Sequence, residues 1–554
     1  MTDLVDTVPL KPVHALLEDA VRRYPDRPAV DFLGKRYSYG EIGDLTRRAA
    51  RGFQLLGVRK GTRVGLCLPN TPYFIICYYA VLMAGGVVVN FNPLYVEREL
   101  SHQINDSGVT VMVTLDLKQI YPKLASLLDD TCLERLVTCS MSAILPSVKS
   151  LLFTVLKRSE LAEIPDDLRH IPFERLVGND GAVRSVALDP ARDLAVLQYT
   201  GGTTGVPKGA MLTHGNLVAN AEQLWRWLPP QSADQPQDRM LGVLPLFHVF
   251  AMTVVMNLGV RMAAELILVP RFEIKQVLKL IARKRPTLFP GVPTIYTALN
   301  QAAAGSDLSS IRLCISGGAP LPAEVRARFE SLTGCRLVEG YGLSEASPVA
   351  TCNPLTGTVK SGSVGRPMDW TTIELRDPVS GVMVEGIGER GEICIRGPQV
   401  MAGYWQRLED TEAVFIDGAL RTGDIGYRDE DGYIFLVDRI KDVILCGGFN
   451  VYPRVIEDAL YQHSAVAEAV VIGIPDAYRG QAPKAFVRLR DGAEATPEEL
   501  KAFLATQISR IEMPKSVEIR EHLPKTMIGK LSKKELVAEE SAAADSQLRA
   551  AGGL

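Results

Sequence analysis

The sequence predicts a large α/β domain, made mainly of parallel sheets with helices, followed by a smaller α+β domain. The chain has 554 residues, more than one hydrophobic core usually holds, so two or more domains are expected. Short apolar strands alternate with amphipathic helices up to about Glu339, a pattern typical of parallel sheets covered by helices. After the charged run 438–442 the pattern starts again with its own helices and strands, as a separate domain would.

Composition and charge exclude several classes of protein. Hydrophobic residues make up 47% of the chain and charged residues 23%, which is ordinary for a globular protein. The net charge of −3 gives no general attraction to nucleic acid, so we expect no nucleic-acid partner. The nine cysteines are dispersed and form no C-x-x-C pair, which argues against a zinc site and favours a reducing compartment. The first residues, MTDLVDTVPL, lack the basic start of a signal peptide, so we expect a cytoplasmic protein.

The stretch from Val64 to Val96 contains no charged residue and has to be compared with a membrane span. A membrane-spanning helix needs about 20 apolar residues in a row. Helix breakers divide this stretch on both sides, at Pro69, Asn70, Pro72, Gly85 and Gly86. We therefore predict a strand, a buried helix and a second strand, over 65–68, 71–84 and 87–90.

A basic amphipathic helix is predicted within 145–161. Its apolar residues fall at helical spacing, and Lys149, Lys157 and Arg158 lie nearby. Such a helix can lie on an anionic membrane surface or pack against the core of its own domain. The pattern favours packing on the core, and peripheral contact with the inner face of a membrane is the alternative.

The stretch around which the chain is organised runs from Tyr199 to Gly209 and reads YTGGTTGVPKG. Glycines let backbone N–H groups approach an anion, threonine hydroxyls add donors, and the Lys208 ammonium suits phosphate. A buried strand precedes the loop and a helix opens at Thr213, so we interpret the loop as a phosphate cradle, with a mobile surface loop as the alternative. Glycine follows Lys208 where the usual nucleotide P-loop has Ser or Thr. The predicted phosphate-binding residues are Thr200, Gly201, Gly202, Thr203, Thr204, Gly205 and Lys208.

Three later strands also end in glycine-rich or proline-rich loops, which read PGVPT from Pro290, GGAP from Gly317 and GYGLSE from Gly340. Ligands of parallel sheets bind beyond the carboxyl ends of the strands. We therefore place a ligand site at this edge of the sheet. His248 lies in PLFHVF, and taken alone it is better explained as a core histidine.

The last third of the chain predicts a change of architecture. From Trp370 to Ile395 hydrophobic residues alternate with period two, which indicates a small antiparallel unit. Beyond the charged run we expect a helix from Pro453 and another capped by Thr496. The predicted divisions are a large domain, a hinge, a small domain and a disordered tail, over 1–437, 438–442, 443–540 and 541–554.

Together these motifs resemble the adenylate-forming superfamily, which includes acyl-CoA synthetases, luciferases and peptide-synthetase adenylation domains. The resemblance covers roughly Leu10 to Leu536, with the motifs in the expected order. Within the superfamily the chain is most similar to bacterial long-chain fatty-acid–CoA ligases. The strings that carry this narrower match are FNPLY at Phe91, HQINDSG at His102, YTGGTTGVPKGAMLTH at Tyr199, GPQVMAGYWQR at Gly397 and GGFNVYP at Gly447.

The resemblance implies ATP-dependent activation of a fatty acid to an acyl-adenylate, followed by transfer of the acyl group to coenzyme A. It implies ATP, CoA and Mg²⁺ as ligands, and four catalytic residues. Lys208 would contact the β- and γ-phosphates, and Glu345 would hold Mg²⁺. Lys530 would reach the substrate carboxylate and the α-phosphate, and His248 would lie beside that carboxylate.

The resemblance also implies a wider nucleotide and CoA site. Tyr341 and the loop 318–320 would hold adenine, and Asp424 would bind the ribose with help from Arg439. Lys441 would lie at the hinge, and the glycine pair 447–448 would line the path of the CoA pantetheine. The full set of expected ligand contacts beyond the phosphate loop is Gly318, Ala319, Pro320, Glu339, Gly340, Tyr341, Gly342, Ser344, Asp424, Arg439, Lys441, Gly447 and Gly448.

Two positions depart from the pattern of fatty-acid ligases, namely Ala419 and Ile440, and they leave alternatives to long-chain specificity open. One alternative is a CoA ligase for a medium-chain, dicarboxylic or aryl acid. A second is an adenylating enzyme that hands its acyl group to a carrier protein. A third, from another class, is a non-catalytic fatty-acid binder at a membrane surface. The oligomeric state is left open, with a dimer among the alternatives.

Overall fold

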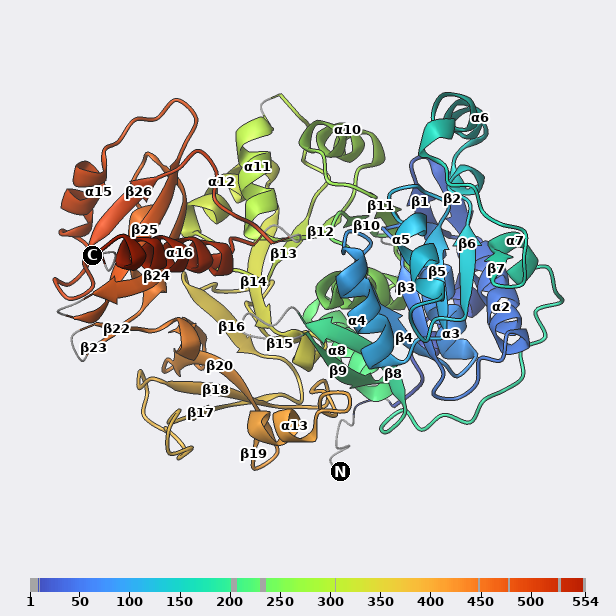
Figure 1. The fold of residues 1–554 in the computed structure, drawn as a ribbon, viewed down its shortest axis with the longest axis horizontal. Helices are drawn as coiled ribbons and strands as arrows, with labels where there is room; N and C mark the ends of the chain where they lie inside the picture. The colour runs from blue at the N-terminus through green and yellow to red at the C-terminus, as the bar shows by residue number, and fades with distance from the viewer. Residues whose placement is uncertain are drawn as a thin grey trace.

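Three sheets form the framework of the computed structural model, which describes residues 8, 10–200, 207–229, 236–303, 305–446, 449–476, 479–526 and 530–551. In Figure 1 the seven-stranded sheet lies on the right, and the five-stranded sheet with the C-terminal helices lies on the left. The fourteen-stranded sheet connects the two sides.

The seven-stranded sheet is parallel except for the hairpin of its last two strands, β8 and β9. Its strands, in spatial order, are β7 (His170–Pro172), β6 (Arg135–Cys139), β5 (Val111–Leu115), β3 (Arg63–Cys67), β4 (Val87–Asn90), β8 (Leu194–Thr200) and β9 (Lys208–Thr213). The helices that connect or follow these strands are α3 (Pro72–Met83), α4 (Glu97–Ser107), α5 (Tyr121–Ala125), α6 (Ser147–Leu156), α7 (Phe173–Leu176) and α8 (His214–Trp227).

The uncharged stretch forms the strand, helix and strand that the sequence predicts, as β3, α3 and β4. Every residue of α3 from Pro72 to Leu82 is buried, since the helix packs against β3, β4 and α2 (Tyr39–Leu55). Among the described residues, no helix combines the length and the apolar character that crossing a bilayer requires.

The fourteen-stranded sheet has a mainly parallel half and an antiparallel half. The first half comprises β2 (Lys35–Ser38), β1 (Pro28–Phe32), β11 (Glu265–Leu268), β10 (Arg239–Gly242), β12 (Leu288–Gly291), β13 (Leu313–Ser316) and β14 (Arg336–Gly342). Only β2 within it runs antiparallel to its neighbour. The second half comprises β15 (Val349–Cys352), β16 (Ser363–Pro367), β21 (Ile434–Arg439), β20 (Ala419–Arg428), β18 (Gly391–Arg396), β17 (Thr372–Arg376) and β19 (Phe415–Ile416), all in antiparallel pairs. The predicted antiparallel unit is therefore confirmed.

One side-chain core unites both of these sheets with the helices around them. The further helices before the C-terminal part are α1 (His14–Arg23), α9 (Leu258–Arg261), α10 (Ile274–Lys284), α11 (Pro293–Ala302), α12 (Ala323–Thr333) and α13 (Leu408–Val414). A π-helical segment, Ala251–Asn257, leads into α9. Short 3₁₀ turns cover Ser126–Leu128, Ser142–Ile144, Arg158–Glu160, Ser344–Ala346 and Ile440–Asp442.

The C-terminal part of the chain has its own sheet and its own core. Its strands are β22 (Ile444–Cys446), β23 (Phe449–Val451), β24 (Val466–Asp476), β25 (Gly480–Leu489) and β26 (Ser516–Ile519), with helices α14 (Pro453–Tyr461), α15 (Pro497–Leu504) and α16 (Lys533–Ala551). The predicted cap of α15 is confirmed, because Thr496 and Glu499 exchange side-chain to backbone hydrogen bonds of 3.2 and 2.7 Å. Helix α16 continues to Ala551, so its last turns lie in the segment for which the sequence predicts a disordered tail.

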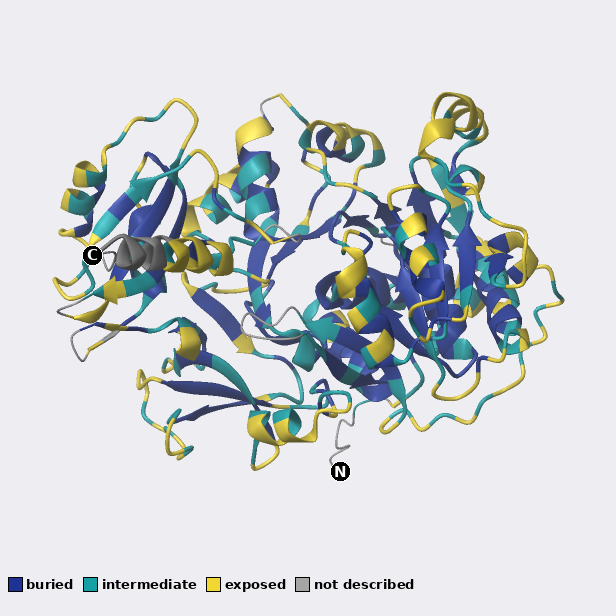
Figure 2. Ribbon diagram, viewed as in Figure 1, coloured by how far each residue is buried: buried dark blue, intermediate teal, exposed yellow. Residues whose placement is uncertain are grey.

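Helix α6 corrects the expectation that the amphipathic segment packs on the core. None of its residues is buried, and Figure 2 shows it exposed at the edge of the molecule. Phe153 alone is partly buried against the main core, and the Lys149 Nζ donates to the Leu33 carbonyl at 2.6 Å. The exposed fractions of its large apolar side chains are 72% for Val148, 67% for Leu151, 51% for Leu152, 65% for Val155 and 71% for Leu156.

Candidate active site

Three neighbouring strands end together at the edge where the site was predicted. Gly291, Ser316 and Glu339 are register partners across β12, β13 and β14. At Gly318, in the loop after β13, the backbone φ is +83°, a conformation that favours glycine. The segment GYGLSE is not a loop throughout, because β14 continues to Gly342 and pairs there with β15. A Cβ on Gly342 would lie 1.7 Å from the Pro348 carbonyl oxygen, so glycine is required at this close approach of two strands.

Lys208 is the first residue of β9, directly after the loop, so a second strand intervenes before the predicted helix α8. Gly201, Gly202, Thr203, Thr204 and Gly205 lie outside the described residues. The Thr200 hydroxyl, before the loop, donates to the Lys208 carbonyl at 3.4 Å. The Lys208 ammonium lies 2.5 Å from Oδ1 of Asp410 on α13 and 5.3 Å from the centre of the Tyr404 ring.

Glu345 lies in the 3₁₀ turn after β14 and faces Tyr404, the residue whose ring lies near Lys208. The Tyr404 hydroxyl donates to Glu345 Oε1 at 2.8 Å. No cluster of three or more metal-ligating side chains occurs within the described ranges of the chain. A single carboxylate nevertheless fits Mg²⁺, since this ion is commonly held by one or two carboxylates together with phosphate oxygens and water.

Tyr341, Asp424 and Arg439, which the resemblance assigns to one nucleotide site, form one connected group. The Tyr341 hydroxyl donates to Asp424 Oδ2 at 2.7 Å, and Arg439 Nε lies 3.0 Å from Asp424 Oδ1. Asp424 and Arg439 are register partners of the antiparallel pair β20 and β21, so the sheet itself places the ion pair. Asp424 is 5% exposed and Tyr341 9% exposed, so both are shielded from water, whereas the Arg439 side chain is 49% exposed.

Lys530 reaches this group from the C-terminal part of the chain. Its side chain lies against Gly318, where a Cβ would come within 2.6 Å of Lys530 Cε. Burial and, to a lesser extent, the positive charge of Arg439 lower the pKa of Lys530 to about 8, although the Asp424 carboxylate opposes both effects. The site thus holds a lysine that loses its proton more readily than an exposed one.

His248 follows β10 and also feels the charge of Lys530. Burial, and then the Lys530 ammonium, lower the pKa of His248 to about 3, so the imidazole is neutral at physiological pH. Its Nδ1 accepts a hydrogen bond from the Phe250 N–H at 3.3 Å. The histidine is therefore a neutral group within the electrostatic influence of the Lys530 ammonium, and its Nδ1 is held by one backbone hydrogen bond.

Glu339, in the middle of β14, is a buried carboxyl between the segment that follows Gly318 and the C-terminal part of the chain. Burial raises the pKa of its carboxyl to about 7, while the Arg454 guanidinium and the Leu321 N–H lower it. Arg454 lies in the first turn of α14, and its backbone N–H donates to Asp438 Oδ2 at 2.8 Å. Glu339 therefore lies within the electrostatic influence of α14.

The other predicted residues that the structure describes lie in turns and on a strand close in sequence to those above. Lys441 lies in the turn between β21 and β22, and a hollow there is bordered by Thr422, Gly423, Arg439, Ile440 and Lys441. Ala319 and Pro320 follow Gly318 in its solvent-accessible loop, Gly340 lies on β14, and Ser344 begins the turn that carries Glu345. Gly447 and Gly448 lie outside the described residues.

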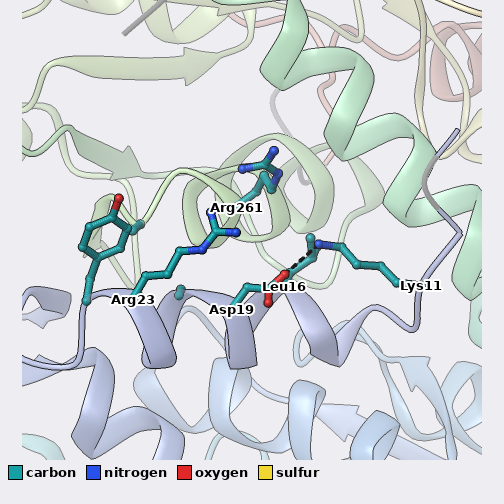
Figure 3. A pocket seen from close by; sticks show the side chains of 8 residues that line it. Lys11, Leu16, Asp19, Arg23 and Arg261 are labelled. Atoms are coloured by element: carbon teal, nitrogen blue, oxygen red, sulfur yellow. Dashed lines mark hydrogen bonds and ion pairs between the residues drawn. The ribbon is translucent and has the colours of Figure 1, made fainter. Parts of the chain in front are cut away.

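A separate hollow lies between α1 and the end of α9 (Figure 3). The side chains that border it include Lys11, Asp19, Arg23 and Arg261, and Lys11 pairs with Asp19 at 2.9 Å. None of the residues that border it belongs to the predicted site.

Sequence reasoning missed two residues that the structure brings to the site, Tyr404 and Asp410. Tyr404 lies inside the string GPQVMAGYWQR, which indicated family likeness without indicating a role. Asp410 contacts Lys208 across 202 positions of sequence, a separation that leaves no local periodicity to detect.

The fold and the site together define an adenylate-forming enzyme. Residues 17–405 match the AMP-binding enzyme family, and residues 455–530 match the AMP-binding enzyme C-terminal domain. The chain therefore belongs to the AMP-binding enzyme family.

The relatives of the chain cover nearly all of its length. It is 42% identical to the long-chain-fatty-acid–CoA ligase of Bacillus subtilis, over 96% of this chain and 95% of that one. It is 40% identical to the enzyme of the same name from Yersinia pestis, over 95% and 94%. A 4-coumarate–CoA ligase 5 of Oryza sativa is 36% identical, over 92% and 90%.

Solved structures agree with the assignment of the chain to this family. ATP-bound MatB from Rhodopseudomonas palustris superposes with a TM-score of 0.82 at 30% identity, covering 95% of this chain and 98% of that one. The anthranilate CoA ligase AuaEII in complex with anthranoyl-AMP superposes with a TM-score of 0.86 at 25% identity, covering 97% and 99%.

Proposed function

We propose that the protein is an ATP-dependent ligase that converts a long-chain fatty acid into its CoA thioester, with AMP and pyrophosphate as the other products. The observation that carries the proposal is the meeting of Lys530 with Gly318, His248 and the Asp424–Arg439 pair. The acid is assigned from the two bacterial relatives, whose names specify long-chain fatty acids.

The first half-reaction requires positive charge because it brings two anions together. The fatty-acid carboxylate attacks the α-phosphorus of ATP, the bond to the bridging oxygen breaks, and pyrophosphate leaves with that oxygen. Lys530 would bind the carboxylate and the α-phosphate at the moment when charge moves between them. Lys208 and the residues from Thr200 onward would hold the β- and γ-phosphates as pyrophosphate departs.

The remaining groups would orient the two substrates. Asp424 accepts hydrogen bonds from the ribose hydroxyls, and its ion pair with Arg439 holds that carboxylate in place. Tyr341 and the loop 318–320 bind adenine. The neutral His248 imidazole orients the acyl carboxylate without adding a second buried charge.

Mg²⁺ is part of the proposal, with Glu345 as its protein ligand. When bound, the ion would neutralise phosphate charge during the displacement. Tyr404 holds the Glu345 carboxylate by its hydroxyl, so the ligand is already oriented.

We also propose that the small domain moves between the two half-reactions about 438–442, with Lys441 in the pivoting turn. A short turn between β21 and β22 joins the two sheets, and such turns can absorb the backbone rotation of a hinge. The rotation would withdraw Lys530 and bring the glycine pair 447–448 toward the path of the CoA pantetheine.

A panel of acids tests the substrate assignment. Acyl-CoA formation is measured with ATP, Mg²⁺ and CoA on acids from C4 to C18, on a dicarboxylic acid and on an aryl acid. We expect kcat/KM to peak at C12 or longer. A peak on another class would keep the mechanism and overturn the substrate, and pyrophosphate release without acyl-CoA would indicate a carrier-protein acceptor.

We further propose that α6 docks the enzyme on the inner face of a membrane, from a reducing compartment such as the cytoplasm. All nine cysteines are unpaired thiols, which fits such a compartment. The exposed apolar side chains of α6 would enter the headgroup region, while Lys149, Lys157 and Arg158 would approach anionic lipids. A water-insoluble substrate would then be taken up near the lipid that dissolves it.

Replacing Leu151 and Val155 by serine is expected to reduce binding to anionic vesicles by about tenfold or more, because each large apolar side chain contributes roughly 1.5 kcal/mol or more when it enters lipid. Co-sedimentation with phosphatidylglycerol vesicles measures this. Val379→Ser is the matched control, since this valine is 94% exposed and lies far along the chain from α6. Unchanged sedimentation, or a dimer that dissociates in the double variant, would contradict membrane docking.

A further inference from the structure

We propose that Asp410 is an intramolecular counter-ion for Lys208, which competes with the β- and γ-phosphates of ATP and with pyrophosphate for the same ammonium group. The inference rests on the proposed phosphate role of Lys208. It adds a residue that tunes how tightly the enzyme holds ATP and how readily it releases pyrophosphate.

The position of Asp410 is built into the fold. The segment before α13 pairs with β9 through three backbone hydrogen bonds, from Met211 N to Gly403 O, from Ala402 N to Met211 O and from Trp405 N to Gly209 O, at 2.8 to 2.9 Å. The chain then turns into α13, where the Thr411 hydroxyl accepts from the Tyr404 N–H at 2.9 Å. These bonds hold the start of α13 beside the first residue of β9.

The side chain of Tyr404 lies between Lys208 and Glu345. The face of its ring lies 5.3 Å from the Lys208 ammonium, and its hydroxyl donates to Glu345. Lys208 thus has the Asp410 carboxylate at 2.5 Å and the face of the Tyr404 ring nearby. Glu345, the proposed Mg²⁺ ligand, lies beyond that ring. A phosphate group that binds the Lys208 ammonium therefore competes with the Asp410 carboxylate for it.

The ion pair between Lys208 and Asp410 is weak enough for phosphate groups to displace the carboxylate. The side chains of Lys208 and Asp410 are 37% and 40% exposed, so water screens their attraction, and such pairs are worth about 0.2–1 kcal/mol. ATP and pyrophosphate carry several negative charges and can displace the single carboxylate. Asp410 therefore neutralises Lys208 when phosphates are absent and takes it back as pyrophosphate leaves.

The test compares ligands that differ in their phosphates. Dissociation constants for ATP, pyrophosphate and AMP are measured by calorimetry for the full-length protein and for Asp410→Asn. We expect ATP and pyrophosphate to bind about two- to fivefold more tightly to the variant, the fold-change that corresponds to the loss of an exposed ion pair. AMP lacks the β- and γ-phosphates, so its affinity should stay unchanged.

Glu409→Gln is the matched control, because it removes the same charge from the neighbouring, exposed position. A control that tightens pyrophosphate binding as much as Asp410→Asn would show a general charge effect and overturn the proposal. Equal tightening of AMP, or no change for ATP and pyrophosphate, would overturn it as well.

Lys208→Gln separates the inference from the function on which it rests. If this variant weakens ATP and pyrophosphate binding and Asp410→Asn has no further effect in its background, the two residues act as a pair. If Lys208→Gln weakens binding and Asp410→Asn still tightens it in that background, Asp410 does not act through Lys208. If Lys208→Gln leaves phosphate binding unchanged, the phosphate role of Lys208 is wrong and the counter-ion proposal falls with it.

Discussion

Replacing Lys530 by alanine is expected to slow acyl-adenylate formation by about 10²- to 10³-fold. The reason is that this lysine is the cation placed against Gly318, beside His248, where charge is expected to move between carboxylate and α-phosphate. Removing one preorganised donor at such a point costs about 2.7–4 kcal/mol of transition-state stabilisation. Single-turnover release of pyrophosphate measures the step.

The control for this variant is Lys534→Ala, which removes an exposed lysine from the start of α16. Thioester formation from supplied acyl-adenylate should fall much less in Lys530→Ala, because the charge rearrangement at phosphorus is then complete. Pyrophosphate release at an undiminished rate in the variant would contradict the role of Lys530.

The lowered pKa of Lys530 adds a pH dependence of definite sign. The free enzyme carries a protonated lysine below a pKa of about 8 and a neutral one above it. Since kcat/KM reports the free enzyme, its value for adenylation should be full below pH 8 and decrease as pH rises through that value. Lys530→Arg should remove this decrease because a guanidinium stays protonated. His248, with its pKa lowered to about 3, should contribute no change above pH 5.

Replacing Asp424 by alanine is expected to lower kcat/KM for ATP by about 10²-fold or more. The substitution removes the acceptor of the Tyr341 hydroxyl, the ion-pair partner of Arg439 and the proposed ribose contact at once. A hydrogen bond to a charged group is worth about 1.5–3 kcal/mol, and a buried group left without its partner costs a similar amount.

The matched control is Asp431→Asn, which removes the charge of a carboxylate paired with Lys360 near the same β20–β21 connection. Asp424→Ala should also move the alkaline decrease of kcat/KM to lower pH, because Asp424 raises the pKa of Lys530. An unchanged KM for ATP together with an unchanged pH profile would contradict this assignment.

Much of the fold could be predicted because its strands are short, apolar and separated by clear breakers. The buried helix α3 illustrates this, since Pro72 and the glycines after it fix both ends of an uncharged segment. The end of α12 follows the same rule, because Gly334 adopts the left-handed conformation that closes a helix.

The errors at α6 and β9 have a common physical cause. The sequence pattern of one segment does not show which other segment packs against it or pairs with it. The pattern of α6 showed an apolar face but could not show that no other element covers it. Strand β9 was missed because Lys208 to Thr213 pairs with β8 through its backbone, and the glycine-rich loop masked that pairing.

The candidate site was predictable where a motif carries a family resemblance and not where no motif marks a residue. The resemblance assigned Tyr341, Asp424 and Arg439 to one nucleotide site, and the sheet brings them into contact. Asp410 could not be found in this way, since its partner lies 202 residues earlier and neither residue is part of a repeating pattern.

The most direct measurement is a single-turnover reaction of the enzyme with ATP labelled at the α-phosphate, Mg²⁺ and palmitate, first without CoA and then with it. We predict that labelled acyl-adenylate accumulates to about one molecule per enzyme before CoA is added. Addition of CoA should convert it to acyl-CoA and labelled AMP. Formation of labelled ADP, or an enzyme that binds palmitate and ATP without forming any labelled adenylate, would contradict the proposed function.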